Sequence, residues 1–535
     1  MKTDIKLLDC TLRDGGYLND WEFGRSNIIN IFERLVSAGI DIIETGFIDD
    51  RRKFDPNRTI FPDTKSADRI YGGLDKGSSM IVGMIDYGTC SEDNVAPADE
   101  CCLDGIRVIF KKHKMHEAID FCRKIKAKGY NVFAQAVSIT SYNDEELSEL
   151  IGLVNDLKPY AFSLVDTYGL LHKGQLRHYF DFACSHLLSS IGIGYHAHNN
   201  FQLAYANCIE LVDDPPRDRM LIVDGTLYGM GKSAGNTPTE LLVMHMNSYH
   251  NTSYHNSQIL EAIEVTMLEM SRKVGWGYSF KFFLAASYDC HPNYVNYLMD
   301  IGKLSVKSIS EILDSLADEK RLLYDADYIK ELYFDYQKRC CADSESVVEL
   351  VKELEGANVL LMGPGKNIYG QRKKVTEYIE SNSSITISIN FIPEDYDTDY
   401  VFMSNAKRYV QLCSALSQQK KRSKLIATSN ITRTLGEFDY TLNYSDLLDE
   451  EALMPDNPLI MLLRFLKKAN VSGIGLAGFD GYRETPVSNY VNPNMEYSYS
   501  SEEADNINRD TVEGIRKLGL GVSPVFVTES IYEKL

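Results

Sequence analysis

Eight short apolar, β-rich runs alternate with longer amphipathic stretches in the first 224 residues, and this alternation constrains the fold more than any other feature. Strands separated by helices predict a parallel sheet, and eight strands are the number that closes a (β/α)8 TIM barrel. Counting alone leaves an open doubly wound sheet as the alternative. The predicted strands are residues 5–10, 41–47, 79–85, 105–110, 131–137, 160–165, 191–196 and 220–224, with helical patterns such as 28–38 and 117–128 between them.

Polar residues stand at or just after the ends of several predicted strands. A TIM barrel forms its active site at the carboxyl ends of the strands, so we expect these residues to meet. If these polar residues only marked the ends of strands, one strand end would not be expected to carry the string HAHNN and another the string RDGG. The residues are Arg13 and Asp14 after the first strand, Glu44 late in the second, Asp166 and Thr167 at the end of the sixth, His196 and His198 at the end of the seventh, and Asp224 at the end of the eighth.

The pair His196 and His198 predicts a metal site. Residues two apart on a strand point to the same side, so both imidazoles can reach one ion. Asp14 can supply a carboxylate ligand and Asn236 a neutral oxygen. The absence of thiolates favours Mn2+ or Mg2+, with Zn2+ left open.

Arg13 suits stabilisation of a developing enolate oxygen beside such an ion. Gly15 and Gly16 follow it and allow a ligand to approach closely. Glu44 is the natural partner to orient the guanidinium. The alternatives are a surface ion pair for Arg13 and buried-charge compensation for Glu44.

Four strings together resemble the DRE-TIM metallolyase superfamily: DCTLRDGGY (9–17), IETGF (43–47), YHAHNN (195–200) and DGTLYGMGKSAGN (224–236). The motif pattern is most similar to the 4-hydroxy-2-oxovalerate aldolases, within a group that also holds hydroxymethylglutaryl-CoA lyases and isopropylmalate and homocitrate synthases. The resemblance implies a TIM barrel over about residues 5–300 and a metal held by Asp14, His196 and His198, with Asn236 a fourth candidate. It also implies that Arg13 polarises a 2-keto acid or acyl-CoA and that Glu44 orients Arg13.

Departures from the family pattern bear on the reaction. Residues 225–236 lack the catalytic cysteine of the hydroxymethylglutaryl-CoA lyases. The aldolases carry a histidine where this chain has Tyr17, and use it with a later tyrosine that Tyr288 resembles. We therefore expect Tyr17 and Tyr288 to position the substrate hydroxyl while His291, or water on the metal, accepts its proton. The alternative is that the ion strongly acidifies one of the two phenols, which is then itself the base.

A basic loop follows the second strand at residues 48–66. Its Arg52 and Arg58 are candidates for binding an acidic or phosphorylated substrate. A solvated basic loop is the alternative.

The predicted reaction is reversible aldol chemistry between a 2-keto acid, pyruvate being the expected one, and an aldehyde. The alternatives are a Claisen-type acyltransferase using acetyl-CoA and a catalytically silent scaffold barrel. The formal net charge of -20 disfavours nucleic acid as a partner, and the basic run 420–422 reads as a solvated helix end. We expect no membrane span and a homo-oligomer such as a dimer. We also expect a cytoplasmic location, because no signal segment or disulfide pattern is evident.

The chain is too long for one core, so a second domain is expected. We predict a barrel domain at residues 1–300, a helical extension at 301–350 and a smaller open-sheet, Rossmann-like α/β domain at 351–535. A strand at 358–362 precedes Gly363, Gly365 and Lys366, which are candidates for binding a nucleotide or phosphate. This loop matches neither a Walker A nor a GxGxxG pattern. A non-catalytic assembly domain is the alternative.

Overall fold

The computed structural model describes residues 4–302, 304–338, 340–419, 423–431, 438–449, 451–484, 489–492 and 499–534. The basic run 420–422 lies outside this part. The chain forms two compact units, Met1–Pro292 and Asn293–Leu535, which are described separately below. No helix in the described ranges is both long and apolar enough to cross a membrane.

The first unit is a closed parallel barrel, which confirms the predicted fold class. Strand β1 pairs with both β2 and β9, so the eight main strands close on themselves. One short strand, β3, adds to β2 and was not predicted. The strands are β1 (Ile5–Asp9), β2 (Ile42–Ile48), β3 (Ile60–Phe61), β4 (Met80–Asp86), β5 (Gly105–Phe110), β6 (Asn131–Ala136), β7 (Ala161–Asp166), β8 (Gly192–Ala197) and β9 (Leu221–Gly225).

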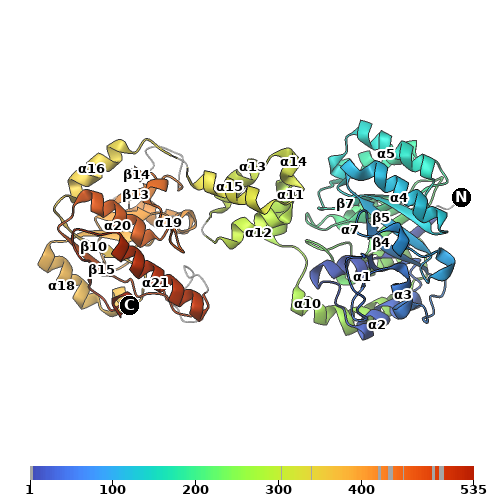
Figure 1. Ribbon diagram of the computed structural model, residues 1–535, viewed down its shortest axis with the longest axis horizontal. Coiled ribbons are helices and arrows are strands. Elements are labelled where there is room, and N and C mark those ends of the chain that lie inside the picture. Colours follow the sequence, from blue (N-terminus) through green and yellow to red (C-terminus); the bar gives the residue numbers. More distant parts are fainter. Residues whose placement is uncertain are drawn as a thin grey trace. The chain divides into compact units, whose positions relative to one another are not determined.

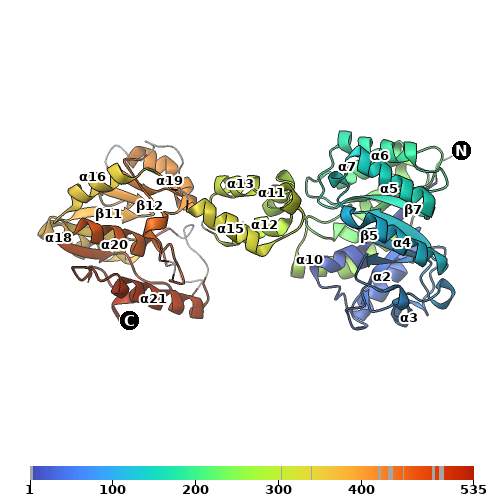
Figure 2. The same cartoon turned by 45° about the horizontal axis from the view of Figure 1, so that its top comes forward.

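Helices surround these strands (Figure 1), and Figure 2 shows α4 to α7 outside β5 and β7. Further helices, α8 to α11, follow the last barrel strand. The helices of this unit are α1 (Thr11–Asp14), α2 (Arg25–Ala38), α3 (Thr64–Tyr71), α4 (Met115–Ala127), α5 (Asp144–Leu157), α6 (Lys173–His186), α7 (Ala204–Asp213), α8 (Thr239–Tyr249), α9 (Asn256–Ala262), α10 (Leu268–Val274) and α11 (Phe280–Ser287).

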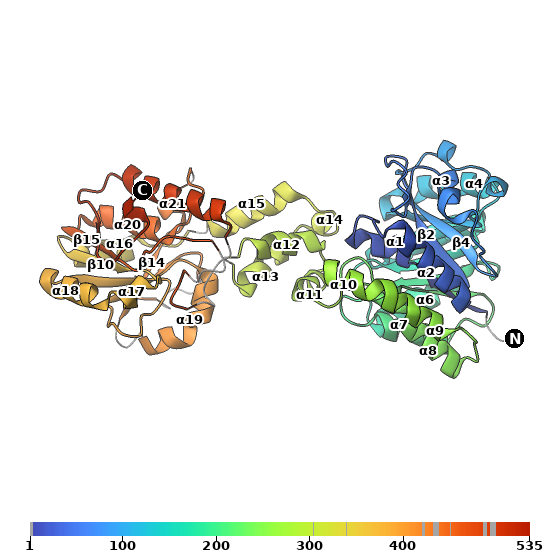
Figure 3. The same cartoon turned by 90° about the horizontal axis from the view of Figure 1, so that it is seen from below.

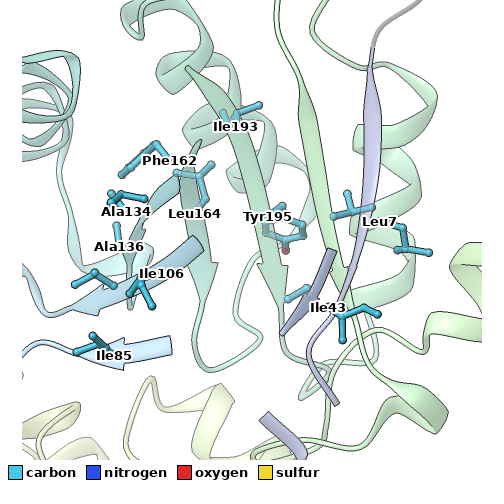
Figure 4. Close-up of a cluster of buried hydrophobic side chains, with 14 of the residues drawn as sticks. Leu7, Ile43, Ile85, Ile106, Ala134, Ala136, Phe162, Leu164, Ile193 and Tyr195 are labelled. Atoms are coloured by element: carbon cyan, nitrogen blue, oxygen red, sulfur yellow. The ribbon is translucent and has the colours of Figure 1, made fainter. Parts of the chain in front are cut away.

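Apolar side chains on the outer face of the strands pack beneath the helices. Leu7, Ile43, Ile106, Phe162 and Tyr195 belong to this layer and are fully buried (Figure 4). Because successive strand residues point to opposite faces, the alternate residues line the inside of the barrel. Burying the outer layer therefore also fixes which side chains face inward.

The inside of the barrel changes from apolar to polar along the strands. One apolar cluster fills the interior with Leu8, Ile42, Val82, Phe133, Ala161 and Ile222. Two residues further along their strands, and thus on the same face, the inward positions carry Cys10, Glu44, Gln135, Ser163 and Asp224. The apolar cluster closes the barrel beneath a buried polar layer.

The second unit contains an all-parallel open sheet in the order β14-β13-β12-β11-β10-β15-β16. Helices α16 (Ser344–Leu354) and α20 (Pro458–Ala469) cover one face, and α18 (Arg372–Asn382) covers the other (Figure 3). Leu350 and Leu462 are buried on the first face and Val375 on the second. Its strands are β10 (Asn358–Met362), β11 (Ile385–Ile389), β12 (Tyr400–Met403), β13 (Lys424–Thr428), β14 (Tyr440–Leu442), β15 (Gly473–Ala477) and β16 (Val525–Phe526).

A set of helices precedes this sheet in the chain. The helices from this point on are α12 (Pro292–Asp300), α13 (Val306–Asp314), α14 (Asp318–Arg321), α15 (Ala326–Gln337), α16 (Ser344–Leu354), α17 (Asn367–Gly370), α18 (Arg372–Asn382), α19 (Ala406–Gln419), α20 (Pro458–Ala469) and α21 (Ser501–Lys517).

Candidate active site

Asp14, His196 and His198 converge at the carboxyl end of the barrel. The Nε2 atom of His196 lies 3.2 Å from Oδ2 of Asp14, and Nε2 of His198 lies 3.8 Å from Oδ1 of the same carboxylate. One ligand atom from each residue falls within 4.8 Å of the others. All three side chains are buried. The three residues that the sequence nominates as metal ligands are therefore in one place.

Hydrogen bonds on the far side of each imidazole fix its orientation. Nδ1 of His196 lies 2.9 Å from Oδ2 of Asp224, and Nδ1 of His198 lies 3.0 Å from the backbone carbonyl of Asp166. If each Nδ1 donates to its oxygen, each Nε2 presents a lone pair toward Asp14. Carboxylate and carbonyl partners of this kind are typical of metal-binding histidines.

Several buried polar atoms at this point have no hydrogen-bond partner in the described part of the chain. They are Nε2 of both histidines and both side-chain polar atoms of Asn236. Asn236 pairs with His198 through an isolated β-bridge, which brings it next to the site. Unpartnered buried polar atoms demand an explanation. A divalent cation between them supplies one, so these residues fit the predicted metal.

The protonation states also suit a metal. Burial disfavours charge on Asp14, but Arg13 and the two imidazoles hold the pKa of this carboxyl well below its usual value. Burial lowers the pKa of His198, which keeps its ring neutral. Burial lowers the pKa of His196, but the neighbouring carboxylates of Asp14 and Asp224 outweigh it, so this pKa is raised. A proton and a metal ion would thus compete for Nε2 of His196.

Arg13 lies between two carboxylates. Its Nε lies 2.6 Å from Oε2 of Glu44, and its Nη1 donates to Oδ2 of Asp14. The arginine is 4% exposed and Glu44 is 0% exposed. These contacts fix the guanidinium beside the candidate metal ligands, with Glu44 in the orienting position that the sequence predicts.

Arg107 extends this arrangement across the barrel. Its Nη1 lies 3.1 Å from Oε2 of Glu44, and its Nη2 donates to Oδ2 of Asp224 at 2.5 Å. Oδ2 of Asp224 also faces His196. We call five charged residues of this site the charge ring: Arg13, Asp14, Glu44, Arg107 and Asp224. His196 closes the ring, because it contacts both Asp224 and Asp14.

The model of the family described as HMGL-like matches residues 4–266. Residues 4–266 are an HMGL-like domain. This finding confirms the resemblance that the four sequence motifs carry. The matched range contains the whole closed barrel and every member of the charge ring.

Named relatives of the HMGL-like domain differ in their reactions. The 4-hydroxy-2-oxovalerate aldolase 2 of Salinispora arenicola is 24% identical over 249 residues, which cover 46% of this chain and 70% of the relative. An oxaloacetate decarboxylase of Mycobacterium tuberculosis is 25% identical over 280 residues, which cover 50% of this chain and 77% of the relative. A 2-isopropylmalate synthase of Sulfolobus acidocaldarius is 24% identical over 246 residues, which cover 45% of this chain and 62% of the relative.

Two residues at the site of the HMGL-like domain were not predicted from the sequence. Arg107 stands inside the strand sequence GIRVIF, where a lone arginine among apolar residues is the signal that could have identified it. Lys232 belongs to the glycine-rich loop. Its backbone N–H donates to Oδ1 of Asp14, and its Nζ lies 5.5 Å from the ring centroid of Tyr17 and 5.9 Å from that of Tyr168. Burial lowers the pKa of Lys232.

The ring of Tyr17 packs against Trp21 and Phe47, with centroids 5.1 and 5.8 Å away, and the residue is 40% exposed. Desolvation raises the pKa of its phenol above the ordinary value even though part of the ring meets solvent. Tyr288 follows α11 directly as its C-cap residue. The phenol of Tyr17 is thus less able to ionise than an ordinary tyrosine.

His291 lies beside the residues that surround Lys232. Its ring centroid is 6.3 Å from that of Tyr168. Burial, helped by the positive charges of Lys232 and Lys111, lowers the pKa of His291 to about 4. The imidazole is therefore neutral at physiological pH and can accept a proton.

The basic residues of the loop after β2 are engaged in ion pairs. Arg52 and Arg58 both pair with Asp20, and Arg58 also lies 2.7 Å from Glu22. Exposed ion pairs contribute little stability. The contacts join this loop to residues 20–22.

Asp166 and Thr167 hold loops at the carboxyl end of β7. The carboxylate of Asp166 accepts hydrogen bonds from the backbone N–H groups of Leu170 and Leu171. Oγ1 of Thr167 accepts from the N–H of Ser138. Both side chains therefore already support the loops that surround the site.

Gly363, Gly365 and Lys366 lie in the second unit. The N–H of Gly363 donates to the carbonyl of Ala477, and that of Gly365 donates to the carbonyl of Gly478. Lys366 immediately precedes the short helix α17. The two glycine amides thus join the loops after β10 and β15.

Asp224 is expected to control metal affinity through His196. Asp224→Asn keeps the size of the side chain but removes the charge that orients His196, so Mn2+ affinity should fall about 10- to 100-fold. Titration of full-length protein with Mn2+ measures this.

Asp213→Asn is the matched control, because Asp213 contacts His245 and His250 in a separate, more exposed His–Asp–His group. Unchanged affinity in Asp224→Asn, or loss of the tight site in Asp213→Asn, would place the ion elsewhere.

Proposed function

We propose that the HMGL-like domain is a divalent-metal-dependent aldolase that makes or cleaves a carbon–carbon bond between a 2-keto acid and an aldehyde. Pyruvate is the proposed keto acid. The observation that carries the proposal is the convergence of Asp14, His196 and His198 beside Arg13, which Glu44 holds in place. The aldolase names among the relatives support the same reaction class.

The metal would be held by Asp14, His196 and His198, with Asn236 as a fourth donor. Mn2+ and Mg2+ suit this set of ligands better than Zn2+, because no thiolate is present among them. When bound, the ion supplies Lewis-acid polarisation of the keto-acid carbonyl. The remaining steps fall to side chains of the chain itself.

Arg13 stabilises negative charge on the enolate oxygen. Its Nε donates to Glu44 and its Nη1 donates to Asp14. Its Nη2 forms no hydrogen bond within the described ranges, so Nη2 is the donor that remains for the substrate. A donor that is fixed before the reaction needs little reorientation when the negative charge develops on the enolate oxygen. Burial strengthens its effect, because water does not screen the interaction.

The charge ring selects an anionic substrate once the metal is present. Its two arginines and three carboxylates have a net charge of −1. A divalent cation reverses this to +1. A 2-keto acid carboxylate then neutralises the centre, so loading of the metal and binding of the substrate support one another.

Proton transfer at the C4 hydroxyl falls to His291. Retro-aldol cleavage requires a base near this hydroxyl. The raised pKa of Tyr17 argues against a phenolate, whereas His291 is neutral above about pH 4. Tyr17 and Tyr288 then position the hydroxyl, and Arg52, Arg58, Asp166 and Thr167 stand as candidates for contact with the rest of the substrate.

A Claisen-type acyltransferase is the second candidate function. The similarity to a 2-isopropylmalate synthase favours it, since that reaction class also passes through an enolate. The two candidates differ in their products. An aldolase consumes pyruvate and an aldehyde without a thioester, whereas an acyltransferase releases free CoA from acetyl-CoA. The intact charge ring argues against a silent scaffold barrel.

The remaining assignments concern organisation. We propose a homodimer formed by the barrel, because Leu260, Val265, Leu268 and Phe280 on or near α9 to α11 are exposed apolar residues. We propose that the partners of this protein are small molecules and not nucleic acid or membrane. The proposed location is the cytoplasm. We also propose that residues 301–350 form an extension separate from an α/β domain at 351–535.

Product analysis tests the proposed reaction directly. Full-length protein with Mn2+, pyruvate and a panel of aldehydes should yield 4-hydroxy-2-oxo acids, and parallel samples with acetyl-CoA should release no CoA. Release of CoA with no aldol product would contradict the proposal and select the acyltransferase.

Arg13→Ala should slow exchange of the C3 protons of pyruvate with solvent by on the order of 100-fold or more. Mn2+ affinity should change much less, because Arg13 is not a ligand. Arg123→Ala is the control, since Arg123 is an arginine on α4 that pairs only with Asp120 among the described residues. Exchange at the wild-type rate in Arg13→Ala would refute the assigned role.

The pH dependence of cleavage distinguishes His291 from an ordinary histidine. Its neutral form is the base, so at saturating Mn2+ the rate constant should stay level from pH 8 down to about pH 5 and fall only near pH 4. His291→Ala should lower cleavage about 100-fold or more but leave pyruvate exchange active.

Tyr17→Phe should retain measurable cleavage, and His116→Ala, at an exposed position on α4, is the histidine control. A rate that titrates near pH 6.5, or complete loss of cleavage in Tyr17→Phe, would overturn this assignment.

A further inference from the structure

The second unit contains a cavity of about 510 Å3 at the carboxyl ends of its parallel strands. The chain runs from β10 through β11, β12 and β13 to β14 in one direction, and then adds β15 and β16 on the other side of β10. The ends of β10 and β15 therefore flank the point where the strand order reverses. Open α/β sheets bind ligands at this point.

The glycines at this point bring two loops together. A Cβ on Gly363 or Gly365 would lie 2.6 or 2.5 Å from the carbonyl oxygen of Gly478. The N–H groups of both glycines donate to the other loop, and the N–H of Asn367 donates to Oδ2 of Asp480. These three amides are therefore not available to bind a phosphate.

Three consecutive strands end in an asparagine that lines the cavity: Asn390 after β11, Asn405 after β12 and Asn430 after β13. Asn390 accepts from the N–H of Ser404 and donates to its Oγ. Asn430 donates to the Ser404 carbonyl and accepts from Oγ1 of Thr428. Each carboxamide still has one N–H and one lone pair that these bonds do not use. Carboxamides donate and accept hydrogen bonds without carrying charge. Hydroxyl groups have the same dual character, so this cluster matches a polyhydroxylated ligand.

Aromatic side chains form another part of the lining. Tyr482 packs against Tyr490 and Tyr499, with ring centroids 6.4 and 5.2 Å apart, and Phe479 and Tyr444 also line the cavity. Rings of this kind offer an apolar surface with a polar hydroxyl at the edge. A sugar ring has apolar C–H faces and a polar rim, which matches that surface.

The charges of the lining disfavour a phosphorylated ligand. Asp300, Asp456 and Asp480 line the cavity with Arg408, which leaves the carboxylates in excess. Phosphate sites rely on arginine, lysine or backbone N–H groups. Oδ1 of Asp480 is buried and has no hydrogen-bond partner in the described ranges, so it is placed to accept from a hydroxyl.

We propose that this cavity binds an uncharged sugar. Oδ1 of Asp480 accepts a hydrogen bond from one hydroxyl group of the sugar, and Asn430 donates to another. The tyrosines contact the C–H faces of the sugar. The inference rests on the second unit alone and does not depend on the reaction of the barrel.

Binding of methyl glycosides to the full-length protein tests this proposal, by saturation-transfer NMR and calorimetry. Methyl glycosides carry no free aldehyde, so they cannot serve as aldol substrates in the barrel. The panel holds methyl glycosides of hexoses, deoxyhexoses and N-acetylhexosamines, with adenosine and inorganic phosphate as comparators. At least one glycoside should bind, and neither comparator should displace it.

Asn430→Ala and Asp480→Asn should each weaken that binding about 10-fold or more, because a sugar hydroxyl in the cavity loses its hydrogen-bond partner. Asn506→Ala, on an exposed face of α21, should bind as the wild type does. If Asp480→Asn does not fold, Asn430→Ala carries the comparison. No glycoside binding, wild-type binding in the variants, or displacement by adenosine or phosphate would each overturn the proposal.

Discussion

The buried ion pairs of Glu44 with Arg13 and Arg107 are the interaction on which the site depends. Neither arginine is more than 4% exposed, so each needs a carboxylate partner inside the barrel. Removing one partner of a buried pair typically costs about 3–5 kcal/mol, because the other charge stays uncompensated. The charge ring draws its members from the segments at β1, β2, β5 and β9. It can form only when the barrel closes, and closure in turn delivers the candidate metal ligands to one point.

Much of this arrangement could be predicted from the sequence. The alternation of strands and helices gave the barrel, and the position of polar residues at strand ends gave Asp14, His196 and His198 as one group. Local pattern suffices there, because a strand end in a parallel barrel has a known location. The pairing of Arg13 with Glu44 was predicted as well, since both ends of that contact stand out as charged residues beside apolar strands.

Other features depend on contacts between distant segments, which a single sequence does not display. Arg107 is distinguishable only as a charge inside an apolar strand, and its partners Glu44 and Asp224 are 63 and 117 positions away. The short strands β3, β14 and β16 have two or three residues each, too few for a periodic pattern. In the second unit the asparagines at three strand ends were visible, but their convergence follows from the sheet order.

The proposed enolate chemistry is open to one test: exchange of the C3 protons of pyruvate with solvent, followed by NMR in D2O before and after metal removal. The charge ring and its ion are proposed to stabilise an enolate, and this exchange needs neither an aldehyde nor a thioester. Exchange is expected in the Mn2+-loaded full-length protein, should be lost on chelation and should return when Mn2+ is restored. Protein that binds Mn2+ at His196 and His198 yet gives no exchange above the free ion would contradict this proposal.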